Sequence, residues 1–339
     1  MSVPGKPRAL LVMDESSFRA HFDRARLDRL AGMVLLGDPI RIDELDSAES
    51  LEKLKYADIL LTSWGAPQLT AERLHHARSL KAVIHAAGSV QGLVSDEVWR
   101  RGIRVSNAAD VNAIPVAEFT LAAIILAGKK APFLAADPAA AREGWGHRNG
   151  YGDLSNYRRT IGVVGFSRIG RRVVRLLDTL DHAQCLVADP FADPDEIRRA
   201  GGVPTGLHDL LPRCDVLTLH APENAQTKGM IGAAELALLP DHATVINTAR
   251  GSLIDPKALE NEARSGRLFA ILDVTDPEPL PLDDPIRSVP NILITPHIAG
   301  SLGTEILRLS DFALDELARW LAREPLHAEV TADLLTTHA

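Results

Sequence analysis

Short runs of apolar residues alternate along the chain with stretches in which apolar residues recur every three or four positions. In the first third of the sequence, the runs typical of strands lie at 8–13, 57–62, 81–85 and 103–105. Amphipathic stretches at 17–30 and 71–77 separate some of these runs and predict helices. Strands that alternate with helices in this way are typical of βα units and a parallel sheet.

A second series of strand-like runs follows beyond residue 107. Its members lie at 160–165, 184–188, 216–220, 244–247, 269–273 and 292–295. Helical patterns separate them, so we predict a doubly wound sheet here too, followed by one more amphipathic helix at 305–322. The predicted fold class is α/β, with two doubly wound parallel-sheet domains.

The most apolar helical pattern covers residues 117–127 and predicts a helix that is buried on all sides, at a domain or subunit interface. The longest apolar stretch, 119–128, is shorter than the roughly 20 residues that cross a bilayer. The apolar run at 9–13 is too short for the core of a signal peptide and predicts a first strand. Residues 142–157 are polar and rich in glycine, which is typical of a connecting loop. We therefore expect no association with membranes.

Length and charge narrow the function classes. At about 150 residues per domain, 339 residues are enough for two domains. The chain has 37 Lys and Arg against 45 Asp and Glu, a net charge of −8, which gives no reason to expect nucleic acid as a partner. Cys185 and Cys214 lie far apart and outside any CxxC pattern. We therefore expect no disulfide framework, no metal site and a reducing, cytoplasmic location.

The first chemical motif is a strand that enters a tight turn and leaves it as a helix, with the sequence GVVGFSRIG over residues 162–170. Gly165 permits the turn, and Gly170 lets the helix pack closely on the strand. Amide groups at the start of the helix then meet a pyrophosphate. Ser167 replaces the middle glycine of the dinucleotide-binding pattern, but its small side chain still allows the backbone to approach the ligand. An ordinary turn between a strand and a helix remains the alternative.

A carboxylate follows the next strand, 24 residues after Gly165. Asp189 at this position would accept hydrogen bonds from the adenosine ribose and repel a 2′-phosphate. No Arg or Lys occurs between Asp189 and Arg198 to bind such a phosphate. We therefore expect NAD rather than NADP. A solvated aspartate that opens a turn before Pro190 is the alternative.

Three charged residues follow strand-like runs in the second half of the chain. They are Arg250 in VINTARG, Glu278 in ILDVTDPEP and His297 in ILITPHIAG, spaced 28 and 19 residues apart, so they can converge at one edge of a parallel sheet. Arg250 can hold a carboxylate in a two-pronged grip. His297 can deliver a proton as a hydride arrives, and Glu278 can fix the imidazole tautomer. Together they can reduce a 2-keto acid, although each residue alone has an ordinary structural alternative.

These motifs resemble those of the D-isomer-specific 2-hydroxyacid dehydrogenases. The runs NTARG at 247–251, DVTDPEP at 273–279 and TPHIAG at 295–300 occur in the family's order and spacing. The resemblance covers nearly the whole chain and implies a Rossmann NAD domain at 107–299. It also implies a smaller, discontinuous, flavodoxin-like substrate domain made of 1–106 and 300–339.

The same resemblance implies roles for individual residues. Arg250 would bind substrate, His297 would be the acid and base, Glu278 its partner, and Asp273 would hydrogen-bond the nicotinamide carboxamide. The implied cofactor-binding residues are Gly165, Ser167, Arg168, Ile169, Gly170, Asp189, His220, Ala221, Pro222, Thr227, Thr248, Ala249, Arg250, Asp273, His297 and Gly300. The segment 107–119 resembles the start of the family's interdomain helix, which in relatives helps to build a homodimer, so a homodimer is expected.

Departures from the family's pattern bear on the substrate. Ala-Gly-Ser at 87–89 replaces the usual Gly-Val-Gly, yet the amides of Gly88 and Ser89 can still bind a carboxylate. The loop at 63–68 has no cation for a substrate phosphate. Trp64 in this loop predicts an uncharged substrate tail, or a small substrate capped by the indole. We therefore expect a 2-keto-acid reductase of the glyoxylate or hydroxypyruvate type.

Three alternatives remain open. A phosphoglycerate dehydrogenase-like enzyme would use the same motifs on a phosphorylated substrate. A formate dehydrogenase-like hydride donor needs no proton exchange at carbon, so an intact pair of Glu278 and His297 argues against it. A non-enzymatic regulator that senses NAD(H) would keep the fold and act through protein partners.

Overall fold

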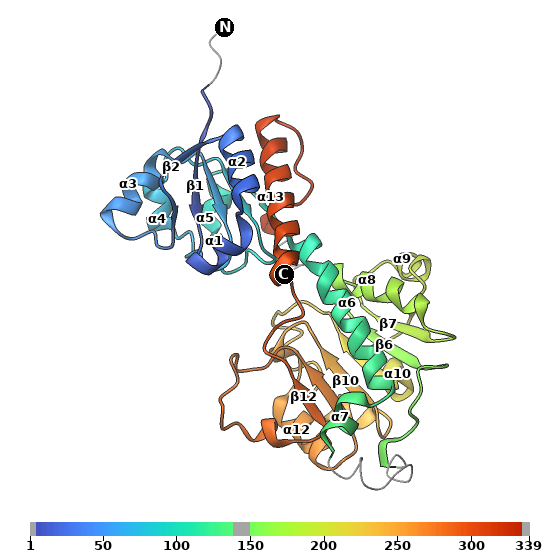
Figure 1. The fold of residues 1–339 in the computed structure, drawn as a ribbon. Helices are drawn as coiled ribbons and strands as arrows, with labels where there is room; N and C mark the ends of the chain where they lie inside the picture. Colours follow the sequence, from blue (N-terminus) through green and yellow to red (C-terminus); the bar gives the residue numbers. More distant parts are fainter. Residues whose placement is uncertain (1–4, 138–149, 334–339) are drawn as a thin grey trace. The chain divides into compact units, whose positions relative to one another are not determined.

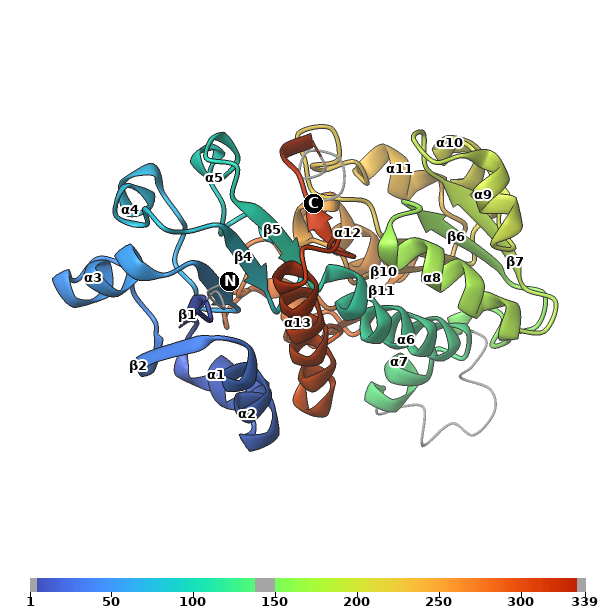
Figure 2. The ribbon, with the colours of Figure 1, turned by 90° about the horizontal axis from the view of Figure 1, so that it is seen from above.

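The computed structural model describes residues 5–137 and 150–333. The chain divides into two compact units, drawn in Figures 1 and 2: unit 1 is Met1–Asn112 with Ser301–Ala339, and unit 2 is Ala113–Gly300. The sequence placed the two boundaries at 106/107 and 299/300. The first of them lies six residues further along because the beginning of helix α6 (Ala109–Gly128) belongs to unit 1.

Unit 1 contains a six-stranded sheet in the order β13-β5-β4-β3-β1-β2. Its strands are β1 (Arg8–Val12), β2 (Leu35–Ile42), β3 (Ile59–Thr62), β4 (Ala82–His85), β5 (Arg104–Asn107) and β13 (Glu329–Val330). All neighbours pair in parallel except β13 and β5, which are antiparallel. The order 2-1-3-4-5 of the first strands is that of flavodoxin-like sheets, as predicted.

Helices from both segments of unit 1, before and after unit 2 in the sequence, cover this sheet. Within the described ranges they are α1 (Glu15–His21), α2 (Arg24–Met33), α3 (Ala48–Tyr56), α4 (Ala71–His76), α5 (Asp96–Arg100) and α13 (Ile306–Leu321). The prediction of a single helix over 17–30 is wrong, because α1 ends at His21 and a second helix begins at Arg24. The side chain of Asp23 accepts a hydrogen bond from the Arg26 amide and so caps the new helix.

Unit 2 contains a seven-stranded parallel sheet in the order β12-β11-β10-β9-β6-β7-β8. Its strands are β6 (Thr160–Val164), β7 (Gln184–Ala188), β8 (Val203–Pro204), β9 (Val216–Leu219), β10 (Thr244–Asn247), β11 (Phe269–Leu272) and β12 (Ile292–Ile294). The chain direction across the sheet reverses between β6 and β9, and this switch point is where open parallel sheets bind ligands. The predicted doubly wound fold is confirmed.

The helices of unit 2 form two layers around its sheet. They are α6, α7 (Ala131–Ala136), α8 (Arg168–Leu176), α9 (Pro194–Arg199), α10 (Leu207–Leu210), α11 (Ala233–Leu238) and α12 (Pro256–Arg264). Val163 packs with the α6 and α8 side chains, whereas the next residue, Val164, packs with those of α10, α11 and α12. Helices α6 and α8 lie side by side on the first face (Figures 1 and 2).

Helix α6 is longer than the predicted pattern at 117–127 and is less buried than predicted. It has 20 residues, and its most apolar 18-residue window has a mean hydropathy of 1.8, so by length and composition alone it is long and apolar enough to cross a membrane. Half of its most apolar window is buried within the structure, where Ala123 and Ile124 join the core over the sheet. The helix is not buried on all sides, because Ile125 and Leu126 are exposed.

The predicted connecting loop at 142–157 lies partly outside the described residues, which resume at 150. Its described part has no strand, and Tyr151 packs against the ring of Phe269. Both cysteines are free and buried, and burial raises the pKa of each thiol to about 12. Neither thiol is therefore a nucleophile at neutral pH.

Candidate functional site

The turn between β6 and α8 requires its two glycines. Gly165 has a φ of +94°, and a Cβ there would lie 2.5 Å from the backbone nitrogen of Ala221. A Cβ on Gly170 would overlap the carbonyl oxygen of Gly165. The turn therefore lies against the loop after β9, and side chains at these two positions would not fit.

Ser167 has a structural task in this turn. Its hydroxyl accepts a hydrogen bond from the Gly170 amide at 3.3 Å and so caps α8, whose first two residues are Arg168 and Ile169. The serine therefore replaces the usual glycine without blocking the start of the helix. The N-terminus of a helix favours an anion, because its amide groups and the helix dipole are positive there.

Asp189 lies at the carboxyl end of β7 and holds two loops together. Its carboxylate accepts hydrogen bonds from the amides of Phe166 at 2.7 Å, Phe191 at 2.8 Å and Ala192 at 3.1 Å. An ionised carboxylate has about four acceptor positions, so room remains for a ribose hydroxyl. Phe191 is 95% exposed, and it was not among the candidate site residues predicted from the sequence. An aromatic side chain directly after Asp189-Pro190 was the available signal.

The loop after β9 brings a buried histidine to the switch point. The His220 amide donates to the Val164 carbonyl at 2.7 Å, and Nε2 lies 3.0 Å from the Thr218 hydroxyl. Burial lowers the pKa of His220 to about 3, so its ring is neutral. Its Nδ1 is buried and has no partner among the described residues. Further along, Thr227 donates to the Pro222 carbonyl at 2.6 Å and closes the turn after Ala221.

Two predicted residues meet beyond β11 and β12. His297 Nδ1 lies 2.6 Å from Glu278 Oε1, and the two side chains are 52% and 39% exposed. His297 has a φ of +54°, a left-handed conformation that only a supported loop maintains. The carboxylate can hold Nδ1–H, which leaves Nε2 available for proton exchange.

Asp273 supplies that support. The side chain is buried and accepts hydrogen bonds from the Thr295 hydroxyl at 2.6 Å and from the Ile298 and Ala299 amides, both at 2.8 Å. Its own carbonyl accepts from the His297 amide at 3.0 Å. The resemblance implied a contact with the nicotinamide carboxamide, which stays a prediction. The structure adds the task of fixing the loop that carries His297, which the sequence did not reveal.

Arg250 lies on the neighbouring loop, after β10. Asn247 shapes this loop, because its side chain donates to the Arg250 carbonyl at 2.7 Å and accepts from the Ala249 amide at 3.0 Å. The guanidinium donates to the Ala249 carbonyl at 2.6 Å and is otherwise exposed. Within the ranges that the structure describes, no hydrogen bond joins Arg250 to Glu278 or His297.

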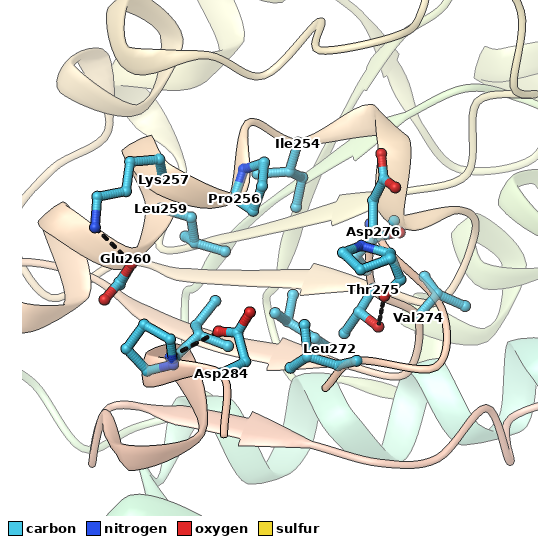
Figure 3. Close-up of a pocket in the computed structure, with 16 residues that line it drawn as sticks. Ile254, Pro256, Lys257, Leu259, Glu260, Leu272, Val274, Thr275, Asp276 and Asp284 are labelled. Atoms are coloured by element: carbon cyan, nitrogen blue, oxygen red, sulfur yellow. Dashed lines mark hydrogen bonds and ion pairs between the residues drawn. The ribbon is translucent and has the colours of Figure 1, made fainter. Parts of the chain in front are cut away.

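The loops of Arg250 and Glu278 nevertheless touch each other. A Cβ on Gly251 would overlap the backbone carbonyl of Thr275, which lies three residues before Glu278. A cavity of about 360 Å³ lies behind this contact, with Gly251 and Asp276 in its lining. Figure 3 shows Asp276 at one end of the cavity and the ion pair of Lys257 with Glu260 at the other.

Two further predicted cofactor residues, Thr248 and Gly300, lie at the end of β10 and at the end of unit 2. The Thr248 hydroxyl is buried 3.0 Å from that of Thr120, so it ties the end of β10 to α6. Gly300 ends unit 2, directly after Ala299. In residues 5–137 and 150–333, no group of three or more His, Cys, Asp or Glu side chains is arranged to hold a metal ion.

The predicted substrate residues belong to unit 1. Trp64 follows β3, and Gly88 and Ser89 follow β4, the parallel neighbour of β3 in the sheet. All three therefore lie beyond the carboxyl ends of adjacent strands. The Ser89 hydroxyl accepts from the Gln91 amide at 3.2 Å, while the indole of Trp64 is 39% exposed.

Comparisons with known proteins match this description. Residues 124–299 match the family model for the NAD binding domain of D-isomer specific 2-hydroxyacid dehydrogenases. The chain is 33% identical over 260 residues to a D-3-phosphoglycerate dehydrogenase of Methanocaldococcus jannaschii, covering 76% of this chain and 48% of that protein. It is 29% identical over 271 residues to a glyoxylate reductase of Korarchaeum cryptofilum, covering 79% and 80% of the two chains.

Among solved structures, the TT0316 protein of Thermus thermophilus is similar over 96% of this chain and 100% of its own, with a TM-score of 0.75 and 28% identity. The chain spans about half the length of the phosphoglycerate dehydrogenases that it matches. Their full activities therefore do not transfer with the match.

Proposed function

The chain belongs to the family of D-isomer specific 2-hydroxyacid dehydrogenases, and we propose that it interconverts a 2-keto acid and the corresponding D-2-hydroxy acid. The reaction consumes a 2-keto acid, NADH and a proton, and yields the hydroxy acid and NAD. The pair of His297 and Glu278, 2.6 Å apart at the end of the unit 2 sheet, is the observation that carries this proposal.

The residues of unit 2 fit the dinucleotide. The glycine turn carries no side chains at Gly165 and Gly170 and would hold the pyrophosphate with its backbone, Ser167 caps α8, and Asp189 would accept hydrogen bonds from the ribose. NAD bound here would supply or take up the hydride at its nicotinamide ring. Phe191 lies exposed beside Asp189, and we propose that it covers the adenine ring.

His297 handles the proton in this proposal. Its Nδ1–H donates to Glu278, which fixes the tautomer and the orientation of the ring. Nε2 then delivers a proton to the oxygen on C2 in reduction and removes it in oxidation. Asp273 keeps the imidazole in place by fixing the backbone on both sides of it.

Arg250, Gly88 and Ser89 are the proposed carboxylate-binding groups. A guanidinium grips a carboxylate with two parallel hydrogen bonds, and backbone amides add donors without charge. The loop of Trp64 at 63–68 has no cation for a phosphate. The next cation along the chain, Arg73, is held by Asp46 at 2.6 Å and by the carbonyl of Gln68. We therefore propose a substrate with an uncharged tail, as in hydroxypyruvate, or with none, as in glyoxylate.

The decisive experiment is a screen of NADH oxidation across 2-keto acids of graded size and charge, repeated with NADPH. The unsubstituted chain should oxidise NADH with at least one 2-keto acid that has an uncharged tail, and His297→Ala should abolish most of that rate. Arg250→Ala should chiefly raise KM. Wild-type rates in both variants would defeat the assignment. Absence of turnover together with tight NADH binding would favour a regulator that senses NAD(H).

A phosphoglycerate dehydrogenase-type activity is the second candidate. It is supported by the 33% identity to a relative of that name. Hydroxypyruvate and its 3-phosphate form a matched pair that differs only in the phosphate group. Because the loop of Trp64 has no cation, we expect the unphosphorylated member to have the higher kcat/KM. The opposite order would make the phosphorylated substrate the physiological one.

We also propose a cytoplasmic homodimer that uses helix α6. Ile125 and Leu126 are large apolar side chains left exposed on this helix. Burying them against a second copy would remove apolar surface from water. Light scattering after size exclusion should give a dimer, and Leu126→Lys should shift the mass toward that of a single chain.

A further inference from the structure

An exposed tryptophan stands on a rigid support in unit 1. The indole of Trp64 is 39% exposed, on the loop that follows β3. Its backbone carbonyl accepts from the Asp14 amide at 3.1 Å. The next residue, Gly65, has a φ of +80°, and a Cβ there would lie 2.6 Å from the Cβ of Asp14. The loop therefore packs tightly on the start of α1 before and after the indole.

The ring of His21 supports the indole itself. The two ring centres are 5.5 Å apart with an interplanar angle of 36°. His21 is the last residue of α1 and is completely buried. An aromatic side chain held in one orientation binds apolar groups with little loss of conformational freedom.

Hydrogen bonds at both nitrogens fix the His21 ring. Nε2 lies 2.7 Å from the Ser63 hydroxyl, and Nδ1 lies 2.7 Å from the Ser310 hydroxyl on α13. Ser310 donates its single hydroxyl hydrogen to the Ile306 carbonyl at 3.1 Å, so it must accept from Nδ1–H. Nε2 then accepts from Ser63, the residue just before Trp64. Burial lowers the pKa of His21 to about 4, so the ring stays neutral and keeps this one tautomer.

We infer that His21 is a positioning residue for Trp64 and thereby helps to select substrates by the side chain beyond C2. This inference rests on the proposed function and makes it more specific. Because His21 is completely buried and contacts the indole ring, it would act on a substrate through Trp64. It holds the platform on which an aromatic or branched apolar side chain of a 2-keto acid would lie. A histidine that only joins α1 to α13 would affect stability and leave selectivity unchanged.

Two variants each remove one kind of support. His21→Phe keeps an aromatic ring under the indole but removes both hydrogen bonds. His21→Gln keeps a polar group within reach of Ser63 but removes the ring. Leu317→Ala is the matched control, because Leu317 lies in the core of unit 1 on the same helix as Ser310. It reports the effect of destabilising the unit without disturbing the loop of Trp64.

The first readout is the ratio of kcat/KM for phenylpyruvate to that for glyoxylate, which carries no side chain. Trp64→Ala and both His21 variants should lower this ratio about tenfold, mainly through KM, because a contact of this kind is worth about one decade in affinity. Leu317→Ala should lower the melting temperature and leave the ratio within about twofold of its original value. If Trp64→Ala lowers the ratio and the His21 variants do not, the inference is overturned.

The second readout needs no activity. Replacing Trp99, Trp145 and Trp320 by Phe leaves Trp64 as the single tryptophan of the chain's four. The anisotropy decay of its fluorescence should then show a larger amplitude of fast local motion in His21→Gln than in the parent, and no increase in Leu317→Ala. Unchanged local motion in both His21 variants would refute the positioning role even in an active enzyme. Absence of turnover in the unsubstituted chain would instead refute the proposed function, and substrate selection with it.

Discussion

Charged groups lie at both ends of the strands in the unit 2 sheet. We call the side where the strands begin the amino edge and the side where they end the carboxyl edge, and the charged groups differ in exposure between the two. At the amino edge, buried Lys130 donates to the His242 carbonyl at 2.6 Å and to the Thr244 hydroxyl at 2.5 Å, with its ammonium 4.3 Å from the Phe269 ring centre. At the carboxyl edge, His297 and Glu278 bind each other but remain about half exposed. An ion pair or buried charge therefore does not by itself mark a reactive site.

The carboxyl edge differs because its His297 and Glu278 side chains are accessible to a ligand. There the buried Asp273 carboxylate accepts hydrogen bonds from two backbone amides and one hydroxyl, which fix the loop. The imidazole of His297 on this loop remains about half exposed. At the amino edge, two hydrogen bonds and the Phe269 ring enclose the Lys130 ammonium itself. The predictions below test this contrast.

The largest effect is expected from His297→Ala. Loss of the proton donor should lower kcat by about 10²–10⁴-fold, with a smaller effect on KM. His182→Ala is the matched control, because His182 is also exposed, has a φ of +55° and lies 3.6 Å from a carboxylate, Asp181. Equal losses of kcat in the two variants would mean that His297 has no special role in catalysis.

Gly251→Ala should have the next largest effect. The new methyl group would overlap the backbone of Thr275, so the loops of Arg250 and Glu278 must separate. Misplacement of such groups by about 1 Å can lower kcat/KM by about 10²-fold. Gly32→Ala is the control, because a Cβ there meets open space. Steady-state kinetics with the best 2-keto acid would measure both, and full activity in Gly251→Ala would show that the contact between the loops does not position the site.

Asp189→Asn tests the cofactor end of the same edge. Asparagine keeps one acceptor oxygen for the Phe191 and Ala192 amides, loses the oxygen that accepts from the Phe166 amide, and removes the charge that repels a 2′-phosphate. The preference for NADH over NADPH, measured as a ratio of kcat/KM, should fall about tenfold, the equivalent of about 1.4 kcal/mol. Asp195→Asn removes an exposed charge from the nearby α9 and should leave the ratio unchanged. An unchanged ratio in Asp189→Asn would assign cofactor choice to other groups.

The sequence predicted most of the fold because the central strands are buried on both faces and read as continuous apolar runs. It missed β2, in which Gly37, Asp38 and Pro39 interrupt the pattern and which pairs with one neighbour only, at the edge of the sheet. It also missed β8 and β13, which have two residues each. Two-residue strands are defined by their partners and leave no periodic signal.

The candidate site was predictable only in part. Spacing and motif predicted that Glu278 and His297 share an edge, and the two side chains are indeed in contact; their catalytic roles stay predictions. The support from Asp273 and the seat of Trp64 on His21 depend on residues 22 to 43 positions apart in the sequence. Such pairs meet only through tertiary packing, which composition and periodicity do not encode.

The smallest effect, and the one that separates the two edges most cleanly, is expected at Lys130. Burial lowers the pKa of Lys130 to about 7, with Arg159 adding a like charge and Asp215 opposing it. In the unfolded chain a lysine titrates near 10.4, so between these values the unfolded state binds more protons. The folded state should therefore gain stability as pH rises from about 7 to about 9.5. Relative to Lys130→Met, the free energy of unfolding of the unsubstituted chain should rise by at least about 1 kcal/mol over this range, measured by urea denaturation.

Lys129→Met is the control for this prediction, because it removes a positive charge from the exposed neighbouring residue of the same segment. Its free energy of unfolding should follow that of the unsubstituted chain across the same pH range. Because the Lys130 ammonium is buried and bonded to the His242 carbonyl and the Thr244 hydroxyl, kcat should remain within about twofold of the original in Lys130→Met. A large loss of turnover without loss of stability would place chemistry at the amino edge and remove the distinction between the two edges.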